Sequence, residues 1–385
     1  MNKVRYFILL SAMLVVLDGC KRNKFEFECM EIPVLQSGDL YVANAVLLKE
    51  GAGRAEFSPD GTKISYHARG NDNYYDCYLM NTDGSGAACL TCDNSGFPGR
   101  HAGQPSWHPG GDYLTFQAEK ESYYTDRNHA LAHPGVGFNN DIYIMKSDGS
   151  QVWQITNLDT KQKVGDKTPF TGVLHPHFSN DGETISWSQK IDKGGEWGVW
   201  EIVVGDFAVV GGEPLVTNLR TFQPGDQHLY YETNDFNADD SKMTISANLK
   251  ADQREVGMDL YEMDVITGEI NALTDSFDNW DESGHYSPDQ QWIAYLGSSG
   301  YTSKKGKKWY KWGKAEFWLM KTDGSRNYPI TAYNCPDSDD FVNNRVMPAY
   351  VSWRADGMAL LVGILVEEDD GTLRDELWRL ELAVY

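Results

Sequence analysis

The sequence predicts an all-β fold, a six-bladed β-propeller, because one short pattern recurs six times and no helical pattern competes with it. In each copy an aromatic residue precedes a polar turn, often Ser-x-Asp-Gly, and an apolar strand follows. The six copies begin at Phe57, Trp107, Phe178, Phe236, Tyr286 and Trp353. Their starts lie about 50 to 70 residues apart, which fits propeller blades with insertions in their loops.

The second copy shows how one repeat divides into strands. Its predicted strands are residues 105–107, 113–118, 141–146 and 152–156. The Asp148-Gly149 turn between the last two strands supplies the positive φ angles that a tight hairpin requires. Four antiparallel strands per repeat are typical of a propeller blade.

The two ends of the repeat array complement each other. The last repeat has three predicted strands, residues 351–353, 358–365 and 376–382, and residues 40–49 form a strand ahead of the first repeat. We expect these two ends to pair and close the ring, because closure leaves no open sheet edge. The predicted propeller domain therefore covers residues 40–385, with residues 20–39 as a linker.

The N-terminus has the features of an export signal. Lys3 and Arg5 precede an apolar stretch, residues 6–17, that is too short for a secure membrane span. The stretch leads to Gly19-Cys20, which resembles a bacterial lipobox. That resemblance implies a signal peptide over residues 1–19, lipidation of Cys20 and a cell-envelope location. Plain secretion is the alternative.

In bacterial lipoproteins, the residue after the lipidated cysteine influences whether the protein stays in the inner membrane or moves to the outer membrane. Lys21 stands there, where an inner-membrane retention signal would usually show Asp. The resemblance therefore implies an outer-membrane lipoprotein that faces the periplasm or the exterior. The membrane would be contacted through the lipid anchor only.

The composition excludes other classes of protein. The chain has 385 residues, a formal net charge of −22 and 12% aromatic residues. This apolar content is enough for a large core and argues against disorder. The acidic excess argues against a nucleic-acid partner, because phosphate binding requires clustered Lys and Arg. The sequence also lacks the Gly-x-Ser-x-Gly elbow of a serine hydrolase.

Five cysteines follow Cys20. Cys89 and Cys92 are separated by two residues, a spacing that suits a local disulfide, a redox pair or half of a metal site. No second pair completes a metal site, so we favour a local disulfide that involves Cys77, Cys89 or Cys92. An exported protein meets the oxidising conditions that such a bond needs.

The repeat also resembles a known family. The Phe-Ser-Pro-Asp-Gly turn at residues 57–61, the Asp-Gly-Ser hairpins and the closing Leu-Thr of residues 90–91 are similar to the repeat of TolB-like six-bladed propellers. The resemblance covers residues 40–385. It implies a non-enzymatic protein that binds a ligand or a partner protein, although propellers of this type also include lyases and peptidase-associated domains.

Insertions gather on one face of the predicted ring. Loops between strands one and two and between strands three and four lie on one face, here the turn face, and are mostly short. The other loops lie on the opposite face, here the insertion face, and hold residues 119–140, 157–174, 190–198, 217–235, 298–315 and 332–350. Long loops on one face predict a binding surface there. Trp309 and Trp312 stand within the basic run 304–314 and are candidates to stack on sugars.

Polar residues also stand where each innermost strand enters the central channel. The predicted metal ligands are His175, His177, His228 and His285, which together with carboxylates suit Mn, Ca or Zn. His175 and His177 are expected on one side of an extended strand, because residues i and i+2 face the same way. His101 and Arg345 are the predicted catalytic residues, and Gln104, Glu232, Asp281 and Glu282 are predicted ligand-binding residues. The alternative is that a wet channel mouth tolerates polar residues that have no task.

A second resemblance concerns the same histidines. The His-Pro-His of residues 175–177 and His285 before the turn at Tyr286 are similar to metal-binding histidines of oligogalacturonate lyases. This resemblance implies metal-dependent β-elimination on an acidic oligosaccharide. The family's general-base histidine would fall near Gln104. Two hypotheses therefore stand: a binding protein, which we favour because no complete catalytic set aligns, and a metal-dependent polysaccharide lyase.

Overall fold

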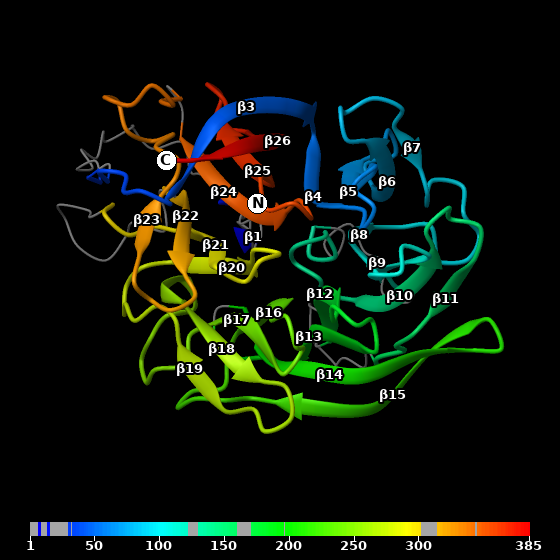
Figure 1. The fold of residues 1–385 in the computed structure, drawn as a ribbon. Helices are drawn as coiled ribbons and strands as arrows, with labels where there is room; N and C mark the ends of the chain where they lie inside the picture. Colours follow the sequence, from blue (N-terminus) through cyan, green and yellow to red (C-terminus); the bar gives the residue numbers. More distant parts are fainter. Residues whose placement is uncertain are drawn as a thin grey trace, which may run out of the picture.

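The computed structural model describes residues 7–8, 14–15, 30–31, 33–121, 130–159, 171–195, 197–301, 314–342 and 345–385. Six four-stranded antiparallel sheets stand around a central axis, as Figure 1 shows in a view along it. The fold is therefore the predicted all-β, six-bladed propeller. A separate two-stranded sheet joins β1 (Phe7–Ile8) to β2 (Leu14–Val15).

The strands of each blade follow one another from the channel outward. Blade 1 comprises β4 (Ala52–Phe57), β5 (Lys63–Arg69), β6 (Tyr75–Asn81) and β7 (Ala88–Cys89). Blade 2 comprises β8 (Ala102–Trp107), β9 (Tyr113–Glu119), β10 (Asn140–Lys146) and β11 (Val152–Gln154). Blade 3 comprises β12 (Gly172–Phe178), β13 (Thr184–Asp192), β14 (Val199–Val210) and β15 (Glu213–Phe222).

The second half of the ring repeats this order. Blade 4 comprises β16 (Tyr231–Phe236), β17 (Lys242–Ala247), β18 (Asp259–Asp264) and β19 (Ile270–Ala272). Blade 5 comprises β20 (Asp281–Tyr286), β21 (Trp292–Gly297), β22 (Glu316–Lys321) and β23 (Asn327–Pro329). Blade 6 comprises β24 (Val346–Trp353), β25 (Ala359–Glu367), β26 (Leu373–Val384) and β3 (Leu40–Glu50).

Apolar side chains fill the spaces between neighbouring blades. Ile142 and Ile144 of β10, for example, pack in one buried cluster with Val173 and Trp187 of blade 3. Because each blade is covered on both faces, its second strand is mostly buried, and every residue of β9 and of β21 is buried. Side chains of adjacent sheets that interdigitate in this way form the core of the domain.

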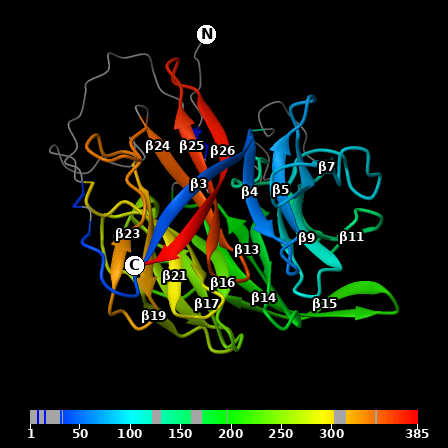
Figure 2. The same ribbon diagram turned by 45° about the horizontal axis from the view of Figure 1, so that its top comes forward.

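The first strand of the domain completes the last sheet. β3 pairs antiparallel with β26, from Leu40 opposite Val384 to Glu50 opposite Glu376. The buried hydroxyl of Tyr328 accepts a hydrogen bond from the Leu40 amide (3.0 Å) and donates one to the Leu40 carbonyl (2.9 Å). Figure 2 shows β3 crossing alongside β26. The N-terminal strand is thus held both by the sheet and by blade 5.

Each innermost strand is interrupted by a bulge at an equivalent position. The register shifts near the middle of β4, β8, β12, β16, β20 and β24. In three of these strands the bulge places a non-glycine residue at positive φ: Gln104 (54°), His175 (53°) and Ser283 (58°). A bulge re-aims the side chains that follow it, so positions beyond it face the channel in a new alternation.

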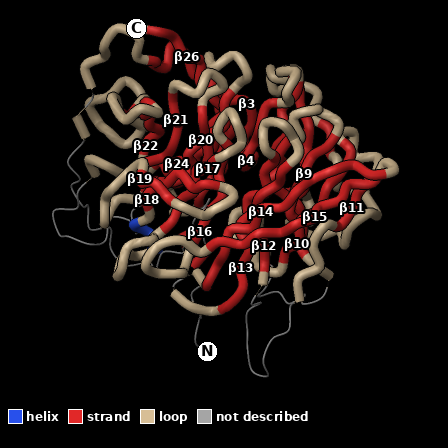
Figure 3. The backbone as a smooth tube through the Cα atoms, turned by 60° about the horizontal axis from the view of Figure 1, so that its bottom comes forward, coloured by secondary structure: helices blue, strands red, loops and turns tan. Residues whose placement is uncertain are grey.

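The described residues contain one helical element, the 3-10 helix η1 (Glu255–Gly257), and helix is blue in Figure 3. No helix in the described part of the chain has the length and apolar character needed to cross a membrane. Cys89 and Cys92 form a disulfide, one of the local pairings among Cys77, Cys89 and Cys92 that the sequence left open, and Cys77 is a buried free thiol. Cys335 is also disulfide-bonded.

Candidate functional site: a six-residue ring at the turn face

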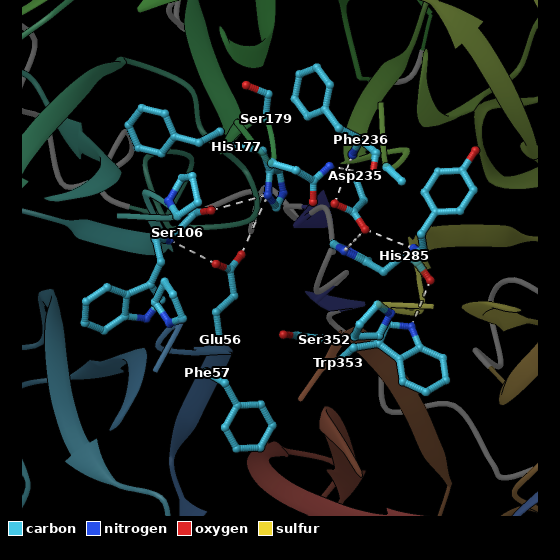
Figure 4. Close-up of a pocket in the computed structure, with 18 of the residues that line it drawn as sticks. Glu56, Phe57, Ser106, His177, Ser179, Asp235, Phe236, His285, Ser352 and Trp353 are labelled. Carbon is cyan, nitrogen blue, oxygen red and sulfur yellow. Dashed lines mark hydrogen bonds and ion pairs between the residues drawn. The ribbon is translucent and has the colours of Figure 1, made fainter. Parts of the chain in front are cut away.

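One pocket of about 480 Å³ lies at the turn-face end of the channel. Each blade contributes to it the residue that directly precedes the aromatic residue of its repeat. These six residues, here the polar ring, are Glu56, Ser106, His177, Asp235, His285 and Ser352. Figure 4 shows members of the ring directed toward a common centre, with Phe57, Phe236 and Trp353 around them. The ring combines two carboxylates, two imidazoles and two hydroxyls.

The repeat motif itself builds the rim of this pocket. In the turn after Phe57, the Ser58 hydroxyl donates a hydrogen bond to Asp60 (2.6 Å), and Asp60 accepts another from the Thr62 amide (3.0 Å). The same Ser-to-Asp bond closes the turn at Ser287 and Asp289 (2.6 Å). The Ser and Asp of the motif are therefore structural, because they satisfy the backbone of a tight turn. The residue before the aromatic is left to face the channel.

His177 lies at the centre of one half of the ring. Its Nδ1 is 3.7 Å from a carboxylate oxygen of Glu56 and 3.4 Å from the hydroxyl of Ser106. Its Nε2 contacts the guanidinium of Arg54, which comes from β4 below the pocket. The Glu56 carboxylate also accepts a hydrogen bond from the Trp107 amide (3.1 Å). His177 thus stands between a carboxylate and a guanidinium.

His285 has a similar carboxylate partner in the other half. Its Nδ1 lies 3.9 Å from the carboxylate of Asp235. Asp235 in turn accepts hydrogen bonds from the amides of Phe236 and Tyr286, both at 2.9 Å. The indole N–H of Trp353 donates to the His285 carbonyl (2.9 Å) and fixes the strand that carries the imidazole.

Burial sets the protonation states in the ring. It lowers the pKa of His285 to about 3 and that of His177 well below its usual value, and the positive charge of Arg54 acts in the same direction. Burial likewise raises the pKa of Asp235 to about 7 and raises the pKa of Glu56. Both imidazoles are therefore neutral at neutral pH, and each can accept a hydrogen bond on one nitrogen.

A second polar layer lies deeper in the channel. The Nδ1 of His175 contacts the carboxylate of Glu232, and the amide of His175 donates to Oε1 of Gln104 (3.0 Å). Glu232 and Glu282 are fully buried. Burial and the negative charge of Glu232 hold the pKa of Glu282 well above its usual range, so the pair shares a proton. This layer supports the ring from below.

Other predicted site residues lie away from the ring. His228 is exposed, and its Nδ1 is 3.2 Å from the hydroxyl of Tyr231. His101 packs against Tyr74, Tyr75 and His133 at the border of blades 1 and 2. The expectation that His101 and His228 stand with the other predicted site residues at the channel is therefore wrong, because both precede the strands that line it, β8 and β16.

The remaining predicted residues have other places. Arg345 forms an ion pair with Glu367 (3.4 Å), so the two proposed catalytic residues belong to different clusters. Asp281 is buried, and burial together with the negative charge of Asp259 raises its pKa to about 7. Trp309, Trp312 and the lipidation candidate Cys20 lie outside the described residues.

The donor set does not match the predicted four-histidine metal site. His228 is on the surface, and Nε2 of His177 already contacts the positively charged Arg54. Among the described residues, one group of three His, Cys, Asp or Glu has its ligand atoms close enough together to share an ion. It consists of Asp76, Cys89 and Cys92, whose two sulfurs are joined in the disulfide. A metal at the channel stays a prediction from the sequence.

Sequence reasoning missed Ser106, Asp235 and Ser352. Their signal was present in the repeat, because each directly precedes the aromatic residue of its copy, as Glu56, His177 and His285 do. A serine within a predicted strand does not by itself indicate a functional site. Alignment of the six copies on the aromatic residue would have found the whole ring.

Comparison with known proteins supports the fold. No family model and no curated protein matches the sequence. Among solved structures, TolB from Acinetobacter baumannii is similar with a TM-score of 0.50 and 14% identity, over 84% of this chain and 65% of that chain. This chain thus spans less than two thirds of that TolB.

Two further similar structures have lower scores. A TolB-type protein from Agrobacterium tumefaciens has a TM-score of 0.44 and 17% identity, over 77% of this chain and 86% of that chain. The oligogalacturonate lyase from Vibrio parahaemolyticus has a TM-score of 0.45 and 10% identity, over 88% of this chain and 86% of that chain. At such identities a likeness concerns the fold alone. The chain therefore shares its β-propeller architecture with TolB-like structures.

Proposed function

We propose that this chain is an exported binding protein of the cell envelope, lipid-anchored through Cys20, that takes a ligand or a segment of a partner protein into the turn-face pocket. One observation carries the proposal. All six blades contribute the equivalent residue to a single pocket, and all six of these residues carry a carboxylate, an imidazole or a hydroxyl group. A pocket of about 480 Å³ with a few converging polar groups is typical of a ligand site.

The chemistry of the ring favours binding over catalysis. A general base works best when its pKa lies near the working pH, and the pKa of His285 lies at about 3. His177 is a weaker candidate still, because its Nδ1 faces Glu56 and its Nε2 contacts Arg54. The polar ring can therefore recognise hydrogen-bonding groups, but neither of its imidazoles has a pKa near neutral pH, as a general base requires.

The lyase alternative requires a site for an acidic oligosaccharide. None of the described residues that line the turn-face pocket is Lys or Arg, and Glu56 and Asp235 in that pocket would repel uronate groups. An acidic sugar would have to use the insertion face, parts of which lie outside the described residues. The insertion face stays the binding surface that the sequence predicts.

In-cell photo-crosslinking tests the proposal. A photoreactive phenylalanine analogue placed at Ala238, an exposed residue on the pocket rim, is expected to give discrete adducts in the cell envelope. Ser352→Trp, which fills the pocket, should abolish them. The matched probe at Asp93, exposed on the insertion face, should give adducts insensitive to Ser352→Trp or none.

Two results would contradict the proposal. Adducts at Ala238 that survive Ser352→Trp would place the contact outside the pocket. Release of unsaturated, ultraviolet-absorbing products from uronate polysaccharides by the purified protein would favour the lyase instead.

A further inference from the structure

The polar ring contains the same carboxylate–imidazole unit twice. In the first unit, Glu56 faces Nδ1 of His177 at 3.7 Å. In the second, Asp235 faces Nδ1 of His285 at 3.9 Å. In both units the Nδ1–H is directed at a carboxylate, which leaves Nε2 as a hydrogen-bond acceptor.

The two units differ in what Nε2 meets. The Nε2 of His177 accepts from the guanidinium of Arg54, which the chain itself supplies. The Nε2 of His285 is buried and has no hydrogen-bond partner within the described structure, although His285 is 7% exposed and lines the pocket. A buried polar atom without a partner costs free energy, so a ligand that donates to it gains affinity. The first unit shows which kind of donor this arrangement accepts.

The surroundings of the pocket select for positive charge. The six turns that form its rim, residues 58–62, 108–112, 179–183, 237–241, 287–291 and 354–358, contain eight carboxylates and one Lys or Arg. The exception, Arg354, forms an ion pair with Asp356 within its own turn (2.9 Å). Hydrogen bonds from Ser58 and Thr62 lower the pKa of Asp60, and those from Ser241 lower the pKa of Asp239, so these carboxylates are ionised.

The aromatic residues of the repeats complete the wall of the pocket. It is lined by Phe57, Trp107, Phe178, Phe236, Tyr286 and Trp353. Phe57, Phe178, Phe236 and Tyr286 are buried in the hydrophobic clusters between blades, so the ring lies in apolar surroundings where electrostatic interactions are strong. Carboxylates and a neutral imidazole acceptor in such surroundings together form a site for an ammonium or guanidinium group.

We propose that the group bound in the turn-face pocket is an organic cation, the ammonium or guanidinium of a basic polypeptide segment or of a free polyamine, held by Asp235 and Nε2 of His285. This inference deepens the proposed function and rests on it. The cation at the second unit would occupy the place that Arg54 has at the first.

Calorimetric titration with short acetylated peptides tests the inference. The peptides differ at one central residue, which is Arg, Lys, norleucine or Glu, and spermidine serves as the free polyamine. The Arg and Lys peptides are expected to bind, with affinity that falls as salt rises, while the norleucine and Glu peptides bind at least about tenfold more weakly. If spermidine binds and the Arg and Lys peptides do not, the bound cation is that of a free polyamine.

Variants locate the cation within the pocket. Asp235→Asn should weaken binding of the Arg peptide about tenfold or more, whereas the matched change Asp93→Asn on the insertion face should leave it unchanged. The peptide comparison on the unaltered protein keeps the test decisive if Asp235→Asn fails to fold.

Failure of the cation inference can be distinguished from failure of the proposed pocket function. Norleucine or Glu peptides that bind as well as Arg, and are blocked by Ser352→Trp, would overturn the cation inference and leave the pocket function intact. No binding by any basic probe would also overturn the inference. Binding of basic probes that Ser352→Trp does not affect would overturn both the inference and the proposed site.

Discussion

The imidazole rings of His177 and His285 lie with their centroids 5.7 Å apart, although they belong to blades 3 and 5. Their carboxylate partners come from two other blades, Glu56 from blade 1 and Asp235 from blade 4. Residues so distant in the sequence meet because all six innermost strands run to the same end of one channel. A change in any of these blades should therefore alter the pocket.

The shared proton of Glu232 and Glu282 makes stability depend on pH. The folded-state pKa of Glu282 lies well above 4.5, so its stabilising contribution is complete below about pH 4.5 and is lost as the pH rises. Glu282→Gln should therefore gain stability relative to the parent protein as the pH rises, by up to about 1.4 kcal/mol per pH unit. Urea unfolding at evenly spaced pH values between about 4.5 and 8 measures the difference in the free energy of unfolding between the two proteins. The exposed Glu121→Gln is the control, and a Glu282→Gln curve parallel to the parent's would contradict the shared proton.

Tyr328 tests how firmly the first strand is held. Tyr328→Phe leaves the amide and carbonyl of Leu40 without their side-chain partner, and we expect a loss of about 1 to 3 kcal/mol in the free energy of unfolding. Tyr385→Phe removes an exposed hydroxyl and should change it by less than about 0.5 kcal/mol. Equal effects of the two changes in urea unfolding would show that Tyr328 does not secure β3.

The Cys77 thiol should be chemically inert in the native protein. It is fully buried, and burial together with the negative charge of Asp76 raises its pKa well above the usual range. Since the thiolate is the reactive form, an alkylating reagent at mildly alkaline pH should label Cys77 only after denaturation. Mass spectrometry of the Cys77 peptide gives the result, with the denatured protein as reference. Equal labelling of both states would disprove the prediction.

The N-terminal signal predicts where the protein is found in the cell. Cys20→Ser should move the protein from the membrane fraction to the soluble envelope fraction, because the lipid attachment site is lost. Lys21→Asp should move it from the outer to the inner membrane, and Lys21→Ala should leave it in place. Membrane fractionation reads out all three, and a Cys20→Ser protein that stays with the membrane would exclude this anchor.

Much of the fold could be predicted from local patterns. The predicted strand 113–118 is found as Tyr113–Glu119, because alternating apolar residues and a preceding turn mark it clearly. The strand predicted at 105–107 in fact begins at Ala102. The sequence of Gly103 and Gln104 does not indicate a strand, and Gln104 adopts a positive φ of 54° at the bulge.

The site was harder to predict because the bulges change which side chains share a face. His175 and His177 were expected to point the same way, as in a regular strand. The register shift between Leu174 and His177 breaks that alternation, so His177 lines the pocket while His175 contacts Glu232 in the deeper layer. A sequence pattern alone gives no sign of such a shift when the bulged residue is not glycine.

Because β3 pairs with β26, the strand of the domain that is synthesised first has no partner until the last strand has been synthesised. During synthesis, the residues around Leu40 emerge while their partners near Val384 do not yet exist. A polypeptide that ends early would keep an unpaired edge on its final sheet and would be exposed to proteolysis and aggregation. That unpaired edge is thus the physical difference between a truncated molecule and a finished one.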